Sequence, residues 1–110
     1  MVGTLVQIVE TTVFTRLISE LMDDESYSLL QTELITDPEK GSIIPGSGGL
    51  GKIRWKLDGR GKRGGIRIIY YWAASRGKIV MLYVFPKNER DDLSKEQLKI
   101  LRQMVESEFK

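Results

Sequence analysis

The chain has 110 residues, of which 41% are hydrophobic and 29% charged, and its net charge is +2. These values are typical of one globular domain, which we expect over residues 1–110. The sequence contains no cysteine and no histidine. Disulfide bonds, zinc sites, Ser-His-Asp triads and histidine-based ribonucleases are therefore excluded. Residues 1–14 do not resemble a signal peptide, and no apolar run approaches the ~20 residues of a membrane span. We expect a cytoplasmic location.

The N-terminal third predicts one strand and two helices. Residues 4–10 are rich in β-branched and apolar side chains, as in a strand. A helix is predicted over residues 13–22, after a threonine cap at Thr11 or Thr12. Its apolar side chains recur at helical spacing at Phe14, Leu17, Ile18 and Leu21.

A second helix is predicted between an aspartate cap, Asp23 or Asp24, and the Asp37–Pro38 pair, which disfavours further helix. Residues 39–51 form a turn-rich connection. The segment GSGGLGK within it matches the spacing of a phosphate-binding loop. However, Ile53 follows where a magnesium-binding Ser or Thr is required, and a strand follows instead of a helix. We interpret its glycines as a turn.

Three strands are predicted next, over residues 52–57, 66–72 and 78–85. The last two are nearly continuous in apolar and aromatic residues, as expected for inner strands. The connections between the three are short enough for hairpins, so the centre of the sheet is expected to be antiparallel.

A last helix is predicted to begin at Ser94. Gln97 lies three residues after this cap and completes a capping box, and Leu93 can pack on Leu98 as a hydrophobic staple. The order of elements is therefore β-α-α-β-β-β-α. It predicts an α+β domain in which helices pack against an antiparallel sheet.

Positive charge is concentrated on the first predicted hairpin. Residues 52–67 hold seven basic residues and one acidic residue, a net charge of +6, so the rest of the chain carries −4. Because strand residues alternate between faces, one face of the first strand is basic and the other apolar. The apolar face is expected to pack on the helices, which leaves the basic face open. The basic face holds Lys52, Arg54 and Lys56, and Arg67 is expected to join it from the next strand. Arg60, Lys62 and Arg63 are expected at the end of the hairpin.

Two interpretations of this basic face remain open. Exposed strands often carry Lys and Arg, which hinder aggregation through the strand edge. However, like charges on adjacent strands repel one another. A polyanionic partner, such as RNA, explains the whole cluster better because it would neutralise that repulsion.

Two segments resemble the RelE superfamily of toxins, and more narrowly its HigB-like branch. They are GGLGKIRWKLDGRGKRGGIRIIYYW and LYVFPKNERDDLSKEQ. Their order and that of the predicted elements agree with this family along the chain. Two positions depart from the family pattern, because Pro86 replaces a glycine and Asn88 stands where many relatives carry arginine.

The resemblance implies a toxin of a type II toxin–antitoxin system. Such toxins are ribosome-dependent mRNA interferases, which enter the ribosomal A site, cleave mRNA without a metal or other cofactor and stop translation. It also implies silencing by a cognate antitoxin with a helix-turn-helix domain. By motif match, the implied catalytic residues are Lys52, Arg54, Arg67 and Lys87.

The remaining candidates are RNA-binding residues. They are Lys56, Arg60, Lys62, Arg63, Tyr71, which could stack on a base, and Tyr83, which could donate a hydrogen bond to phosphate. Arginine suits transition-state stabilisation, whereas lysine can also transfer protons. The competing predictions are a non-catalytic RNA-binding domain and a basic sheet that docks an acidic protein.

Overall fold

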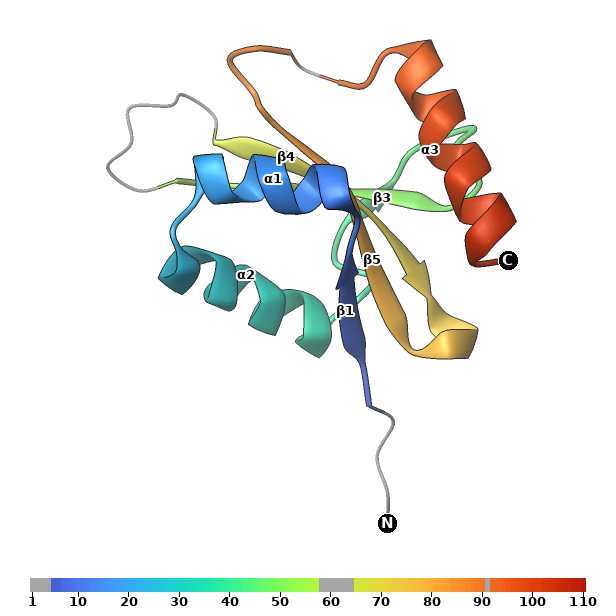
Figure 1. Cartoon of the computed structure of the whole chain (residues 1–110), viewed down its shortest axis with the longest axis horizontal. Helices are drawn as coiled ribbons and strands as arrows, with labels where there is room; N and C mark the ends of the chain where they lie inside the picture. The colour runs from blue at the N-terminus through green and yellow to red at the C-terminus, as the bar shows by residue number, and fades with distance from the viewer. Residues whose placement is uncertain (1–4, 58–64, 91) are drawn as a thin grey trace.

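The structure is a computed structural model that describes residues 5–57, 65–90 and 92–110. A single sheet lies between helices on both of its faces (Figure 1). The elements, in chain order, are β1 (Gln7–Glu10), α1 (Thr12–Leu21), α2 (Asp24–Thr36), β2 (Ser42–Ile43), β3 (Leu50–Trp55), β4 (Ile66–Ala73), a 3₁₀ turn (Ala74–Arg76), β5 (Lys78–Pro86) and α3 (Lys95–Glu108).

The strand order across the sheet is β1-β5-β4-β3-β2. Strands β3, β4 and β5 pair antiparallel, as predicted. Strand β2 also pairs antiparallel with β3, whereas β1 joins β5 in parallel. The predicted α+β class and order of elements are confirmed. Two details differ from the prediction, because the sheet is mixed and the turn-rich connection contributes the short edge strand β2.

The predicted caps position the helices. The Thr11 hydroxyl accepts a hydrogen bond from the Phe14 amide at 3.1 Å and donates to the Leu82 carbonyl at 3.1 Å, so it both caps α1 and ties it to β5. Asp23 caps α2 through the Ser26 amide. Ser94 and Gln97 form the predicted capping box of α3.

Helices α1 and α2 cover one face of the sheet, and their core includes Phe14, Leu30, Leu34, Ile53, Ile68 and Met81. Helix α3 packs on the other face, over a smaller core of Leu50, Ile69, Val80, Leu82, Phe85, Leu101 and Val105. The basic face of β3 is therefore the face that α3 partly covers. The prediction that this face is open is wrong where α3 packs, because the apolar side chains on that face require a helix to cover them, whereas Arg54 and Lys56 are exposed.

A β-bulge in β5 adjusts this second face. Ile69 pairs with Tyr83 and Tyr70 pairs with Met81, so Leu82 is an extra residue in the ladder. Leu82 and Tyr83 consequently pack on the same side, against α3.

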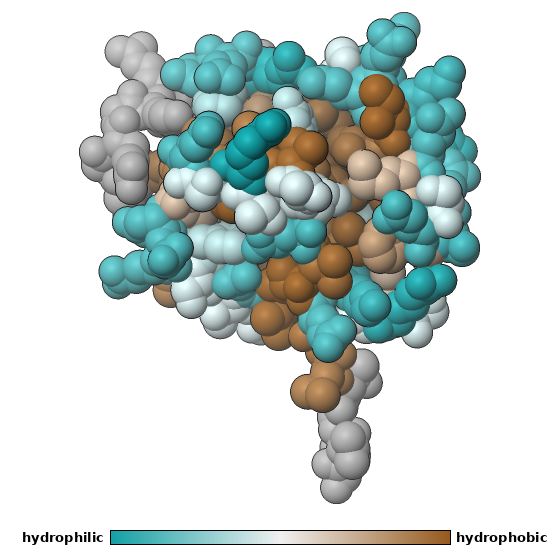
Figure 2. Space-filling view, viewed as in Figure 1, coloured by the Kyte–Doolittle hydropathy of each residue, from teal (hydrophilic) through white to brown (hydrophobic). Residues whose placement is uncertain are grey.

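Apolar surface remains visible between α1 and α3 in Figure 2. The groove there is lined by Thr11, Val13, Leu82, Tyr83, Gln97, Ile100, Leu101 and Met104. Across the described ranges, every helix is too short or too polar to traverse a lipid bilayer.

Candidate nucleic-acid interface

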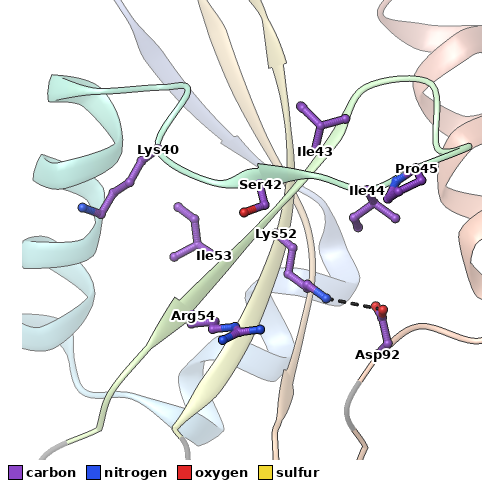
Figure 3. A pocket seen from close by; sticks show the side chains of 9 residues that line it. All are labelled: Lys40, Ser42, Ile43, Ile44, Pro45, Lys52, Ile53, Arg54 and Asp92. Carbon is purple, nitrogen blue, oxygen red and sulfur yellow. Dashed lines mark ion pairs between the residues drawn. The ribbon is translucent and has the colours of Figure 1, made fainter.

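A cavity with a volume of about 580 Å³ lies beside the edge strand β2. It is lined by Lys40, Ser42, Ile43, Ile44, Pro45, Lys52, Ile53, Arg54 and Asp92. Figure 3 shows Lys52, Arg54 and Asp92 on one side of β3, below Ile44 and Pro45. Lys40 and Ile53 lie on the opposite side of the strand. The volume is within the range of about 300–1,000 Å³ that accommodates small ligands.

The strand alternation predicted for β3 places the two cations of the cavity. Lys52 and Arg54 are two residues apart and share a face, while Ile53 between them is buried in the α1–α2 core. The Lys52 side chain is 20% exposed, and Arg54 is exposed. Lys56, the next residue in this alternation, follows the end of β3 and is exposed. Two cations of the predicted catalytic set therefore line one cavity.

Arg67 lies directly across from Arg54 in the β3–β4 ladder. This places the two guanidinium groups on the same face, as the sequence predicted. Arg67 is nevertheless only 6% exposed, so the prediction that it stands on an open face is wrong. One of its Nη atoms donates to the Ile66 carbonyl at 3.3 Å, and no buried side-chain nitrogen or oxygen of the described residues lacks a hydrogen-bond partner.

Lys87 follows the end of β5 and is exposed. Its backbone amide donates to the Gly65 carbonyl at 3.0 Å, which fixes it beside the start of β4. Lys87 is therefore close in the sheet to Arg67, but it does not line the cavity of Lys52 and Arg54.

The two candidate aromatic residues lie elsewhere. Tyr71 pairs with Leu50, four residues along β4 from Arg67, which corresponds to about 13 Å of strand. The ammonium group of Lys110 lies 5.6 Å from the centroid of the Tyr71 ring. Tyr83 packs against the α3 core and borders the apolar groove between α1 and α3. The structure brings neither ring to the cavity, and their predicted contacts with RNA stay predictions.

Three candidate RNA-binding residues, Arg60, Lys62 and Arg63, lie outside the described residues. Their roles at the hairpin end therefore also stay predictions.

Asp92 is a feature of the cavity that sequence reasoning missed. Its Oδ2 lies 3.4 Å from the Lys52 Nζ, and its Oδ1 accepts a hydrogen bond from the Leu93 amide at 2.9 Å. Forty positions separate Lys52 from Asp92, so local periodicity carries no signal for this ion pair. The only signal in the sequence is that Asp92 closely precedes the Ser94 cap and must therefore lie near the start of α3.

A buried tyrosine supports the rim of the cavity. The Tyr70 hydroxyl donates to the Pro38 carbonyl at 2.8 Å and accepts from the Gly41 amide at 2.9 Å. Burial raises the pKa of Tyr70 above its ordinary value of 10.0, so the phenol keeps its proton and its hydrogen-bond donor to a higher pH than a solvent-exposed tyrosine. These bonds hold the backbone that leads into β2, and β2 forms the outer wall of the cavity.

This arrangement can bind an anion. Lys52 offers a point charge with three donors, and Arg54 offers a planar fork that matches a phosphate. The fold and the site therefore define a small α+β domain with a cationic cavity beside its sheet, suited to phosphate groups.

A family model described as the RelE toxin of the RelE/RelB toxin–antitoxin system matches residues 6–110. The chain belongs to the RelE toxin family. Members of this family are the toxins of toxin–antitoxin pairs and in general cleave mRNA. The narrower resemblance to the HigB-like branch stays a prediction.

Proposed function

We propose that this chain is a ribosome-dependent mRNA endoribonuclease that needs no metal ion, inhibits translation and is neutralised by a cognate antitoxin. The observation that carries the proposal is the arrangement of Lys52, Arg54 and Arg67. Two of these cations line one cavity, and the third lies opposite Arg54 in the adjacent strand. Two adjacent guanidinium groups lower the stability of the fold, because they repel each other and one of them is removed from water. A surface without a ligand-binding role would not require such a pair.

The proposed reaction is an internal phosphoryl transfer. The RNA 2′-oxygen forms a bond to the adjacent phosphorus, and the bond from phosphorus to the 5′-oxygen of the next nucleotide breaks. The products are a 2′,3′-cyclic phosphate and a 5′-hydroxyl. The 2′-hydroxyl proton must be accepted, and the leaving oxygen must receive one. Negative charge grows on the phosphate oxygens, where fixed Arg donors stabilise it most.

Arg54 and Arg67 are assigned to charge stabilisation, because a guanidinium does not usefully release a proton. Lys52 and Lys87 are the remaining candidates for proton transfer, with Lys52 as base and Lys87 as acid. A base needs an unprotonated amine, whereas Lys52 is ion-paired with Asp92. This ion pair must therefore open when the substrate enters. Positioning of the mRNA by the ribosome would supply much of the rate enhancement.

A cell-free translation reaction tests the proposal. Wild-type protein should stop translation at catalytic concentrations and leave cuts within ribosome-bound mRNA. Arg54→Ala should lower the cleavage rate on the order of 10²-fold or more. Lys99→Ala, which removes an exposed cation of α3, serves as the matched control and should cleave at the wild-type rate. Intact mRNA at stoichiometric protein would overturn the proposal.

One observation favours the alternative of a non-catalytic RNA-binding domain. The amine expected to act as the base is engaged by a carboxylate. A binding domain would use Lys52 and Arg54 for phosphate contacts alone. It would slow translation only when in excess over the ribosome, and Lys52→Arg would leave its effect unchanged. Loss of cleavage in Lys52→Arg with retained RNA affinity would instead support proton transfer.

The proposed antitoxin, with a helix-turn-helix domain, could act in two ways. It could cover the cationic face, or it could grip β1 and the helices and block entry to the ribosome. The charge of −4 outside residues 52–67 favours the second route, because such a partner would not compete with RNA. The purified complex should then keep its salt-sensitive RNA affinity while losing translation arrest. Loss of both activities would show direct occlusion.

A further inference from the structure

Asp92 is out of place in a cavity that serves only to bind phosphate. A carboxylate repels phosphate oxygens, and it weakens the field of the cations around it. Of the described residues that line the cavity, Asp92 is the one that carries a negative charge. An ion pair with Lys52 explains why a carboxylate is tolerated there. It does not explain the function of the part of the carboxylate that faces the cavity.

The Asp92 carboxylate keeps free acceptor capacity. Each of its oxygens accepts about two hydrogen bonds, and the described contacts occupy one position on each, through Leu93 and Lys52. The side chain is 56% exposed, so more than half of its surface is open. It can therefore accept further hydrogen bonds from a ligand in the cavity.

An apolar wall lies above the charged groups. Pro45 is exposed and Ile44 is partly buried, and both lie on the same side of β3 as Lys52 and Asp92 (Figure 3). The cavity is thus divided into an apolar wall, a cationic floor and one carboxylate. A nucleotide has the same division, because its base presents a flat apolar face and polar edge groups, while its phosphate is anionic.

We infer that Ile44, Pro45 and Asp92 form a nucleobase subsite, and that Asp92 selects bases with an exocyclic amino group. This inference rests on the RNA binding in the proposed function and adds the base preference to it. Cytosine, adenine and guanine present an amino donor that a carboxylate can accept. Uracil presents a single N–H between two carbonyl oxygens, and these oxygens are repelled by the carboxylate.

Short homopolymers isolate this preference. Oligocytidylate and oligouridylate hexamers carry the same phosphates and pyrimidine rings, so the ratio of their affinities cancels the contribution of the backbone. One hydrogen bond from a base to a carboxylate corresponds to about a tenfold difference in affinity. Wild-type protein should therefore bind the cytidine hexamer about tenfold more tightly, as measured by fluorescence anisotropy at constant salt.

The test uses two carboxylate variants. Asp92→Asn keeps the shape of the side chain but adds a donor that can bind a uracil carbonyl, so the affinity ratio should fall to about one. Glu106→Gln removes the same charge from another exposed ion pair, that with Arg102, and should keep the wild-type ratio. A thermal melt of each variant checks folding, and Asp92→Asn should melt like wild type because it is exposed.

Three results would overturn the inference. They are a wild-type ratio near one, an unchanged ratio in Asp92→Asn, and no measurable affinity for either hexamer. The assay needs neither ribosomes nor cleavage, so it separates this inference from the proposed function. A protein that selects cytidine through Asp92 but leaves ribosome-bound mRNA intact would have the subsite without the proposed activity. A protein that cleaves mRNA without this selection would show the reverse.

Discussion

Arg54 and Arg67 lie opposite each other in the β3–β4 ladder. Arg54 is exposed, whereas Arg67 is buried with only 6% of its surface exposed. Truncating each to alanine should therefore affect stability and RNA binding differently. Arg54→Ala removes a solvated cation and relieves its repulsion with Arg67, so the free energy of unfolding should stay within about 0.5 kcal/mol of wild type. Arg67→Ala relieves the same repulsion, but it removes the donor to the Ile66 carbonyl and leaves a cavity at a buried position, for a net cost of about 2 kcal/mol.

These free energies convert into melting temperatures. For a chain of this length, 1 kcal/mol corresponds to about 4 °C in Tm. Arg67→Ala should thus melt about 8 °C below wild type, and Arg54→Ala within about 2 °C of it. Circular dichroism melts measure both. Binding to a short single-stranded RNA at several salt concentrations should show that Arg54→Ala loses one phosphate contact, which lowers the salt slope by about 0.7.

Lys99→Ala is the control for loss of one positive charge, and it should leave both Tm and the salt slope near the wild-type values. An Arg67→Ala protein that melts with wild type would refute the argument from burial. A wild-type salt slope in Arg54→Ala would refute the assignment of Arg54 to the RNA-binding cavity.

Three further predictions concern the frame that holds the site. Gly65→Ala should cost at least about 2 kcal/mol, because φ is +67° and an added Cβ would lie 2.0 Å from the Trp55 carbonyl oxygen; a urea midpoint near wild type would contradict this. Ser94→Ala should cost about 1 kcal/mol by removing the α3 cap, measured in the same titration, and an unchanged midpoint would show that the cap contributes little. Burial raises the pKa of Tyr27 and Tyr70 above their ordinary value of 10.0, so the stability that depends on these neutral phenols is fully present below pH 10 and is lost progressively as the pH rises toward the higher pKa of the folded state. The urea concentration at the unfolding midpoint should therefore be lower at pH 11 than at pH 9. This decrease should be smaller in Tyr70→Phe. An equal decrease in both proteins would exclude Tyr70 as a cause.

Positive and negative charge are distributed unevenly along the chain. Residues 52–67 carry a net charge of +6, whereas the rest of the chain carries −4. Members of the RelE toxin family in general cleave mRNA and pair with an antitoxin, and an uneven charge distribution suits two such different partners.

Much of the fold follows from local rules that the sequence displays directly. The period of two in β3 determined that Lys52 and Arg54 share a face opposite Ile53, because consecutive side chains of a strand alternate. The cap predicted at Thr11 or Thr12 and the cap at Ser94 located the starts of α1 and α3 to within a residue, because such hydroxyls satisfy amides that the helix leaves unpaired. The family motifs likewise indicated the RelE toxin family before any contact was known.

Only the tertiary structure decided what surrounds those side chains. Helix α3 packs on the basic side of the sheet, since Leu50, Ile69 and Val80 also need to be buried there. Arg67, on the same side of the sheet, is buried as well. The Lys52–Asp92 ion pair joins positions that are forty residues apart. Periodicity and capping depend on neighbours within a few residues, whereas these contacts depend on how whole elements pack across a sheet.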